Sequence, residues 1–165
     1  MSSTPSDPIF ISTFSPDFDK AVAKAFHDLN IIWIKAFFEV EEKDRQTLEN
    51  PRSTIIDKGG EVFIATRRAD DKIIGTVAMI PVTENRAELV KMAVAEEAKG
   101  LGVGHQLGEA AIDWARTKGM QEVFLETNSK LKPALGLYEK LGFKHIDPDD
   151  SPYDRCDVQM ILTVR

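Results

Sequence analysis

The sequence predicts a mixed α/β fold of the α+β kind, with a twisted, mostly antiparallel sheet of about six to seven strands flanked by about four helices. Two observations predict this class. Apolar residues recur at helical spacing early in the chain, whereas residues 61–95 change to the strand period and to strand-forming residues. From residue 99 onward, helical and strand patterns alternate, which is typical of a sheet with crossover helices.

A short strand and an amphipathic helix are expected first. Residues 9–14 favour a strand. Ser15 is a candidate N-cap and Pro16 suits the first helical position, and apolar residues then keep helical spacing from Phe18 to about Asn30.

Two further helices are expected before the sheet. Residues 32–39 are rich in aromatic side chains and predict a second helix. Charged residues 41–48 predict a third, which ends at Asn50-Pro51 because the residue before a proline disfavours helix. The acidic residues Glu39, Glu41, Glu42 and Asp44 are expected to form a solvated face.

The sequence pattern after residue 60 predicts a hairpin, a third antiparallel strand and crossover units. The C-terminal strand is a candidate edge for a homodimer. The expected strands are 61–66, 72–80, 87–95, 121–127, 143–146 and 158–163, with helices at 103–118 and 133–141.

The chain has 165 residues, which suits one domain over residues 9–165 after a flexible N-terminus at residues 1–8. Its polar start lacks the basic and apolar parts of a secretory signal. Cys156 is the single cysteine, so an internal disulfide is excluded. Both features favour a cytoplasmic protein.

Acidic side chains outnumber basic ones by 27 to 21, a net charge of −6 with neutral histidine. Nucleic-acid-binding faces are normally basic, so no nucleic-acid partner is expected. Apolar stretches are shorter than the about 18 residues of a membrane span, so no membrane partner is expected either. The acidic balance is compatible with a cationic or amine partner, although many enzymes share it.

The glycine-rich turn after residue 98 carries the strongest functional signal. Gly100, Gly102 and Gly104 stand at alternate positions where a helix begins. Glycine permits positive φ, and backbone N–H groups that converge at a helix N-terminus form a cradle for an anion, usually phosphate. Taken alone, the turn fits a plain strand-to-helix connection equally well.

Two nucleotide-binding motifs do not fit this turn. A Walker P-loop needs Gly-Lys-Ser/Thr at its end, where His105 and Gln106 stand. A Rossmann fingerprint needs glycine or alanine at His105 or Leu107, depending on its start. Nucleoside triphosphate and dinucleotide chemistry are therefore disfavoured.

Two motifs, in the same order, resemble the GCN5-related N-acetyltransferase (GNAT) superfamily. Lys99-x-x-Gly102-x-Gly104 resembles Gln/Arg-x-x-Gly-x-Gly/Ala, the loop that binds the pyrophosphate of acetyl-CoA. Residues 134–143, ALGLYEKLGF, resemble the family's Ala-x-x-Leu-Tyr-x-Lys-x-Gly-Phe element. The resemblance is specific over about residues 61–146. It implies the GNAT fold and an acetyl-CoA-dependent N-acetyltransferase.

The resemblance also implies where the donor binds. The strand backbone would pair with pantetheine and the loop would hold the pyrophosphate. Lys99 keeps a cation where the family has Gln or Arg but loses the planar fork. Leu131 stands where many members have Asn, with Asn128 or Ser129 as a substitute. The implied contacts are Met92, Ala93, Val94, Lys99, Gly100, Leu101, Gly102, Val103, Gly104, His105 and Asn128.

By the same resemblance, Tyr138 would act as the acid near the thioester sulfur and Glu88 as the general base. Both residues have a simpler interpretation. Tyr138 shares a helix face with apolar residues and could belong to the core, and a strand glutamate is usually exposed. Glu126 is the next candidate base.

Trp33 and Phe37 fall in the region that forms a wall of the family's acceptor pocket, although aromatic residues at this spacing also suit a core. The implied acceptor is a primary amine of a small molecule or peptide: a polyamine, amino acid, aminoglycoside, protein N-terminus or lysine side chain. No metal is expected because the histidines lack ligand spacing, and Cys156 is not needed as a nucleophile. The alternative is a non-catalytic sensor of CoA or acyl-CoA. A purely structural protein leaves the motifs unexplained.

Overall fold

The computed structural model describes residues 7–14, 20–148 and 153–165. No helix in these ranges is both long and apolar enough to cross a membrane. The elements are β1 (Ile9–Thr13), α1 (Lys20–Phe37), α2 (Glu42–Glu49), α3 (Pro51–Thr54), β2 (Glu61–Arg67), β3 (Lys72–Pro81), β4 (Arg86–Val94), α4 (Val103–Thr117), β5 (Glu122–Thr127), α5 (Lys132–Lys140), β6 (Lys144–Ile146) and β7 (Val158–Thr163).

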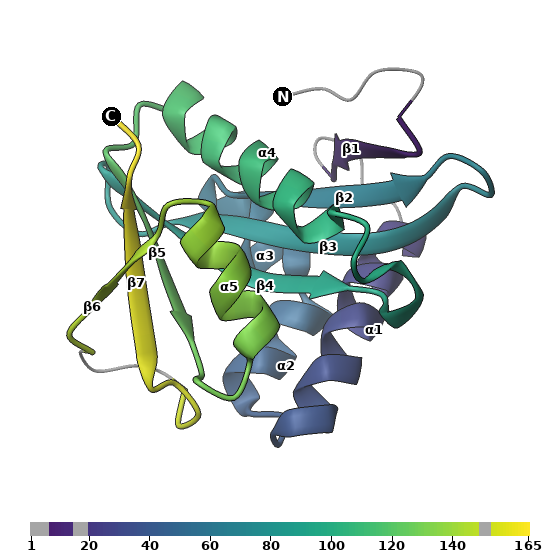
Figure 1. Cartoon of the computed structure of the whole chain (residues 1–165), viewed down its shortest axis with the longest axis horizontal. Coiled ribbons are helices and arrows are strands. Elements are labelled where there is room, and N and C mark those ends of the chain that lie inside the picture. Colours follow the sequence, from purple (N-terminus) through teal and green to yellow (C-terminus); the bar gives the residue numbers. More distant parts are fainter. Residues whose placement is uncertain (1–6, 15–19, 149–152) are drawn as a thin grey trace.

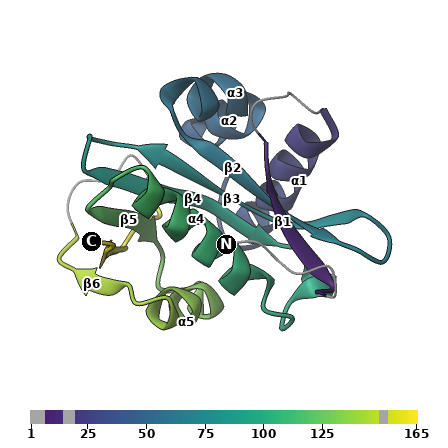
Figure 2. The same ribbon diagram turned by 90° about the horizontal axis from the view of Figure 1, so that it is seen from above.

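One seven-stranded sheet runs through the molecule in the order β1-β2-β3-β4-β5-β7-β6. Its neighbours pair antiparallel except for β4 and β5, which are parallel. Helices α4 and α5 cover one face, and α1, α2 and α3 cover the other (Figures 1 and 2). The predicted mixed, mostly antiparallel α/β class is confirmed.

Each face of the sheet has its own apolar core. On one face, Val103, Leu107 and Ala111 of α4 are buried against the strands. On the other face, Phe26 and Ile34 of α1 are fully buried among strand residues. The α4 positions recur every four residues and the two α1 positions are eight residues apart, so in each helix they lie on one face, and this face is the one that covers the sheet.

The two helices predicted on either side of residue 31 form a single helix, α1. Asn30 lies buried inside it and does not interrupt it, because its side chain finds two partners there. Its Nδ2 donates to the carbonyl of Phe26 at 2.9 Å, and its Oδ1 accepts from Trp33 Nε1 at 2.9 Å. The predicted helix start at Ser15-Pro16 lies outside the described residues.

The C-terminal strand is not an edge strand, and that expectation is wrong. β7 pairs with β5 on one side, as Leu162 with Val123, and with β6 on the other, as Met160 with His145. Within the described sheet, β1 and β6 are the edges. A homodimer remains a prediction, without β7 as its edge.

The pairing of β4 and β5 ends part of the way along the strands. Their parallel ladder joins residues 86–88 to residues 122–124 and stops at Glu88 and Phe124. Beyond it, β4 shifts register against β3, and Lys91 has a positive φ of 56°. A bulge of this kind bends a strand and re-aims its side chains. The divergence of β4 and β5 positions the site described next.

Candidate active site

A cavity of about 830 Å³ lies along β4 beyond the point where its pairing with β5 ends. Its lining comes from segments distant in sequence: β4, the glycine turn, the end of β5, helix α5, the end of α1, and residues 153–156. One part is rich in glycine and lysine, and the other is rich in aromatic and acidic side chains. We call the first part the glycine half; it is lined by Lys99, Gly100, Gly102, Gly104, His105 and Lys140. We call the second part the acceptor half; it is lined by Trp33, Phe37, Phe38, Glu88, Lys91, Glu126, Tyr153 and Arg155.

The glycine half is formed where α4 begins. Gly102 is the N-cap of α4 with a φ of 78°, and no side chain hydrogen-bonds the helix start. The first N–H groups of a helix without a side-chain cap favour an anion, as does the positive end of the helix dipole. Lys99, Lys140 and His105 also line this half. This arrangement suits a phosphate-bearing ligand.

Gly104 lies close to helix α5. A Cβ atom there would lie 2.9 Å from Leu137 Cδ2 of α5. This is too close for a normal contact, so the end of the Leu137 side chain would have to move to admit a side chain at Gly104. Leu137 precedes Tyr138 on α5, so the change would occur next to the candidate acid.

Most of the residues predicted to contact the donor line the cavity; Leu101 does not. It is 59% exposed and is not part of the lining. Asn128 lines the cavity, but its side-chain amide already bonds to backbone groups of the protein. Its Nδ2 donates to the Arg155 carbonyl, and its Oδ1 accepts from the Lys130 backbone N–H. The predicted residues that do line it are Met92, Ala93, Val94, Lys99, Gly100, Gly102, Val103, Gly104, His105 and Asn128.

Tyr138 belongs to the core and to the cavity at once. It is the buried residue of α5, only 7% exposed, and its ring packs edge to face on Phe143 at 6.0 Å between centroids. It also lines the cavity. Burial raises the pKa of its phenol above the usual value, so the group keeps its proton at neutral pH and can serve as a proton donor.

Glu88 lies at the end of the β4–β5 ladder and lines the cavity together with Glu126 of β5. Burial, reinforced by the negative charge of Glu126, raises the pKa of Glu88 to about 7. Glu126 Oε1 accepts a hydrogen bond from Gln159 Nε2 at 3.0 Å. A carboxylate with a pKa near neutrality can both take and release a proton under physiological conditions.

Aromatic side chains form the wall of the acceptor half. Trp33, Phe37 and Phe38 line it from the end of α1, and Tyr153 lines it from the segment before β7. Phe37 is 51% exposed and stands at the rim. Trp33 is held in place by the hydrogen bond from its Nε1 to Asn30. The two predicted substrate-binding residues, Trp33 and Phe37, therefore both reach the cavity.

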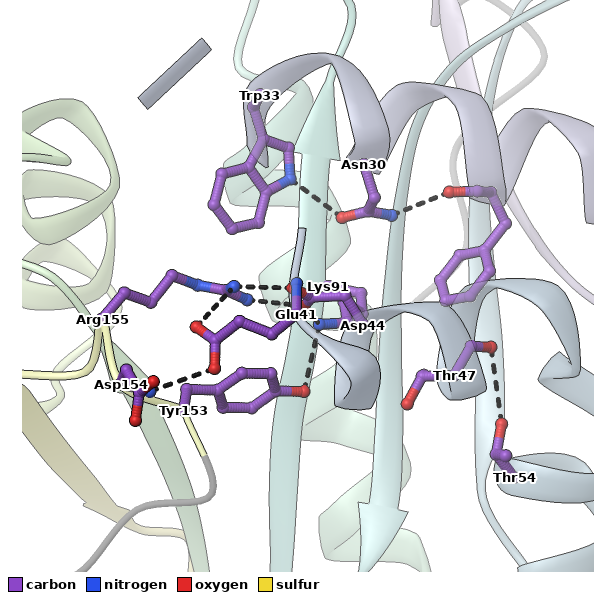
Figure 3. A network of polar contacts seen from close by, with 11 residues as sticks. Asn30, Trp33, Glu41, Asp44, Thr47, Thr54, Lys91, Tyr153, Asp154 and Arg155 are labelled. Carbon is purple, nitrogen blue, oxygen red and sulfur yellow. Dashed lines mark hydrogen bonds and ion pairs between the residues drawn. The ribbon is translucent and has the colours of Figure 1, made fainter. Parts of the chain in front are cut away.

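Sequence reasoning missed the ion network behind this wall (Figure 3). Asp44, expected on a solvated face, is 0% exposed. Its Oδ1 lies 2.6 Å from Lys91 Nζ, and both of its oxygens accept from the Arg155 guanidinium at 2.6 and 2.7 Å. Lys91 Nζ also donates to the Tyr153 hydroxyl at 3.1 Å. The network joins α2, β4 and the segment before β7.

One residue signals this network in the sequence. Lys91 interrupts an apolar strand, between Val90 and Met92, and a lysine buried in a strand needs a partner. The partner itself has no local signal, because Asp44 lies 47 positions earlier and Arg155 lies in the loop before the last strand. Only the fold brings the three side chains together.

Metal-ligating side chains do not gather in the described part of the chain. No group of three or more His, Cys, Asp or Glu residues there could hold a metal ion. Cys156 lines the cavity, and its Sγ lies 3.5 Å from the Val158 carbonyl.

One cavity thus joins an anion cradle, a buried phenol and a carboxyl group whose pKa is raised to about 7. The model of the acetyltransferase (GNAT) family matches residues 26–143, and the chain belongs to this family. The resemblance drawn from the two motifs is thus confirmed. Human N-acetyltransferase 8B is 36% identical over 81 residues, which cover 46% of this chain and 36% of that protein. The chain spans under half the length of the curated relatives that it matches.

Solved structures share the fold along nearly the whole chain. A GNAT-family acetyltransferase from Staphylococcus aureus superposes with a TM-score of 0.83 at 21% identity, covering 95% of this chain and 99% of that one. Spermidine N-acetyltransferase from Vibrio cholerae, in complex with CoA and spermine, has a TM-score of 0.69 at 21% identity and covers 94% of this chain and 95% of that one.

Proposed function

We propose that the protein transfers the acetyl group of acetyl-CoA to a primary amine of a small molecule or peptide. The observation that carries the proposal is one cavity that joins a helix-terminal anion cradle to a buried phenol, Tyr138, and to Glu88 with a pKa of about 7. Family membership supports acetyl transfer. The CoA and spermine held by the Vibrio cholerae structure support the two ligand classes.

The glycine half fits the donor. Its helix start, with Lys99 and Lys140 nearby, suits a pyrophosphate, and the β4 backbone over residues 92–94 suits an extended pantetheine chain. When bound, acetyl-CoA supplies an activated thioester carbonyl. We assign the backbone N–H of Met92, at the bulge, the task of stabilising negative charge that develops on the carbonyl oxygen.

Glu88 is proposed to take a proton from the amine, directly or through water, because an ammonium has no lone pair with which to attack. A pKa of about 7 suits this task near neutral pH. The neutral amine adds to the thioester carbonyl, the C–S bond breaks as the carbonyl re-forms, and the nitrogen loses its second proton to solvent. Tyr138, whose phenol stays protonated, is proposed to give its proton to the departing sulfur. No cysteine nucleophile is needed.

An amine panel with acetyl-CoA tests the proposal. Released thiol reports turnover, and mass spectrometry identifies the acetylated amine. We expect transfer to at least one amine, strongly reduced by Glu88→Gln and unaffected by the matched control Glu84→Gln, which alters an exposed turn residue. CoA binding without transfer to any amine would favour the non-catalytic sensor instead, and failure to bind CoA would overturn both.

A further inference from the structure

The two buried cations of the acceptor half are already neutralised by carboxylates of the protein. The side chains of Lys91 and Arg155 are 4% and 12% exposed, and both bind Asp44, whose side chain is 0% exposed. Arg155 Nη1 also lies 3.3 Å from Glu41 Oε2. Two positive charges are therefore matched by two negative charges within this network (Figure 3).

Arg155 is also enclosed by aromatic rings. The carbon at the centre of its guanidinium lies 4.5 Å from the centroid of Tyr153, 5.7 Å from Trp33 and 5.8 Å from Phe38. Its planar fork is bound in bidentate fashion by Asp44. Asp44 and Glu41 occupy Nη1 and one N–H of Nη2, so an incoming carboxylate that bound at these groups would have to displace one of them and leave a charge of the protein buried without its partner.

The remaining charges facing the acceptor half are mostly negative. Glu88 and Glu126 line the cavity, and Glu126 Oε1 accepts a hydrogen bond from Gln159 Nε2 at 3.0 Å. Lys130 lies at the exposed rim, 5.5 Å from the Phe38 ring, where solvent screens its charge. An acceptor that carries a carboxylate would thus meet the carboxyl groups of Glu88 and Glu126, while Lys91 and Arg155 already bind carboxylates of the protein and Lys130 is exposed to solvent.

We infer that the acceptor is an amine without a carboxylate beside its amino group, and that Asp44 and Glu41 set this preference by holding Lys91 and Arg155. The inference rests on the proposed function and narrows its substrate class. An aromatic body suits the rings of Trp33, Phe38 and Tyr153. Asp44 and Glu41 act through Arg155 and Lys91 and are therefore positioning residues.

Matched pairs of amines test the preference. Phenethylamine is compared with phenylalanine, and agmatine with arginine, because the members of each pair differ only by the carboxylate. We expect kcat/KM to favour the carboxylate-free member by about tenfold or more, since like charges placed side by side disfavour binding. Where the amine panel yields a better acceptor, that amine and its carboxylated analogue form the pair. Equal rates or preference for the amino acid would overturn the inference.

Glu41→Gln and Asp44→Asn connect the preference to the network. Both variants leave positive charge without its carboxylate, so we expect the preference ratio to fall several-fold, more in Asp44→Asn than in Glu41→Gln. Glu42→Gln, which removes an exposed acid of the same helix, should keep the parental ratio. A purely structural role would lower both rates and leave the ratio unchanged, which would overturn the role of these residues.

Glu41→Gln is the milder of the two variants, and it allows the test to be made even if Asp44→Asn does not fold. The Glu41 side chain is 22% exposed and makes one of the three contacts between Arg155 and carboxylates, so Glu41→Gln should fold even where Asp44→Asn does not. An unchanged ratio in folded Glu41→Gln and Asp44→Asn counts against the inference. Absence of transfer to every amine counts against the proposed function instead, so the two failures are distinguishable.

Discussion

Asp44 is a buried carboxyl group and Glu88 a half-buried one, both beside the cavity, yet their surroundings shift their pKa values in opposite directions. Burial alone would raise both. At Asp44, the hydrogen bonds from Arg155 and the charge of Lys91 outweigh burial and lower the pKa to about 2. At Glu88, burial and the charge of Glu126 raise the pKa to about 7, against the weaker opposing effects of Lys43 and Lys91.

The difference between the two carboxyls lies in direct contact. Asp44 accepts from two cations at 2.6 to 2.7 Å, whereas the cations acting on Glu88 do so through their charge alone. A pair of carboxyls with separated pKa values has separated roles. Asp44 is a permanent charge that holds the wall together, and Glu88 is a group whose proton can move.

Lys91 links the two carboxyls. Burial lowers the pKa of its amine, and the charge and hydrogen bond of Asp44 oppose that effect. Its backbone has a φ of 56°, which costs a residue with a Cβ atom about 1–2 kcal/mol. The contact with Asp44 offsets that cost and keeps Lys91 at the bulge, where β4 leaves the ladder that ends at Glu88.

The largest expected effect comes from breaking the ion network. Asp44→Ala leaves Lys91 and Arg155 buried without their carboxylate, and we expect the free energy of unfolding at pH 7 to fall by about 3–5 kcal/mol. Denaturant titration measures it. The pKa of Asp44 is lowered, so its stabilisation is complete above pH 3.8 and is lost as pH falls through about 2. The difference between variant and parent should therefore shrink in acid.

Glu42→Ala is the control for that variant, because Glu42 is exposed on the same helix. Its replacement should lower the free energy of unfolding by less than about 0.5 kcal/mol. A loss in Asp44→Ala no larger than that of Glu42→Ala would show that the buried network contributes little to stability.

The next effect concerns the carboxyl whose proton moves. We expect Glu88→Gln to lower kcat/KM for the amine by about 10²–10³-fold while the Kd of acetyl-CoA stays unchanged. In the parent, kcat/KM should rise with pH through about 7, because Glu88 must be deprotonated to accept a proton. This rise of kcat/KM around pH 7 should be absent in Glu88→Gln. If it persists there, the base is another group, and Glu126→Gln is the next variant to measure.

Tyr138→Phe should have a smaller effect on turnover, about 10–100-fold in kcat. A thiolate is an acceptable leaving group without full protonation, so the loss falls at or below the usual range of general acid catalysis. The phenyl ring keeps its packing on Phe143, and the melting temperature should change little. Normal kcat in a well-folded variant would mean that Tyr138 is a core residue only.

The sequence predicted the parts of the molecule that depend on local pattern. Strand and helix periods placed β7 at the residues observed and α4 within a residue or two, and the two motifs identified the family. Tyr138, Glu88 and Trp33, which line the cavity, could be singled out because they stand in or near recognisable segments, and their roles stay predictions. The buried state of Asp44 was missed because helical spacing alone cannot show that a loop after residue 152 returns to cover it. The edge position of β7 was wrong for a similar reason, since the placement of β6 depends on tertiary packing.

The smallest expected effect is a change in the free energy of unfolding. Its sign at pH 8 is opposite in the Glu88→Gln and Asp44→Ala variants. The pKa of Glu88 is raised from 4.5 to about 7, so the fold favours its protonated form. The stabilisation from that form is complete below pH 4.5 and is lost as pH rises through about 7. Glu88→Gln keeps a neutral side chain at every pH, and we expect it to be about 1–2 kcal/mol more stable than the parent at pH 8 and close to the parent at pH 5. Asp44→Ala should be less stable than the parent at both values. Melting curves of the three proteins at the two pH values decide it: a Glu88→Gln difference that is the same at pH 5 and pH 8 would mean that Glu88 does not titrate between them.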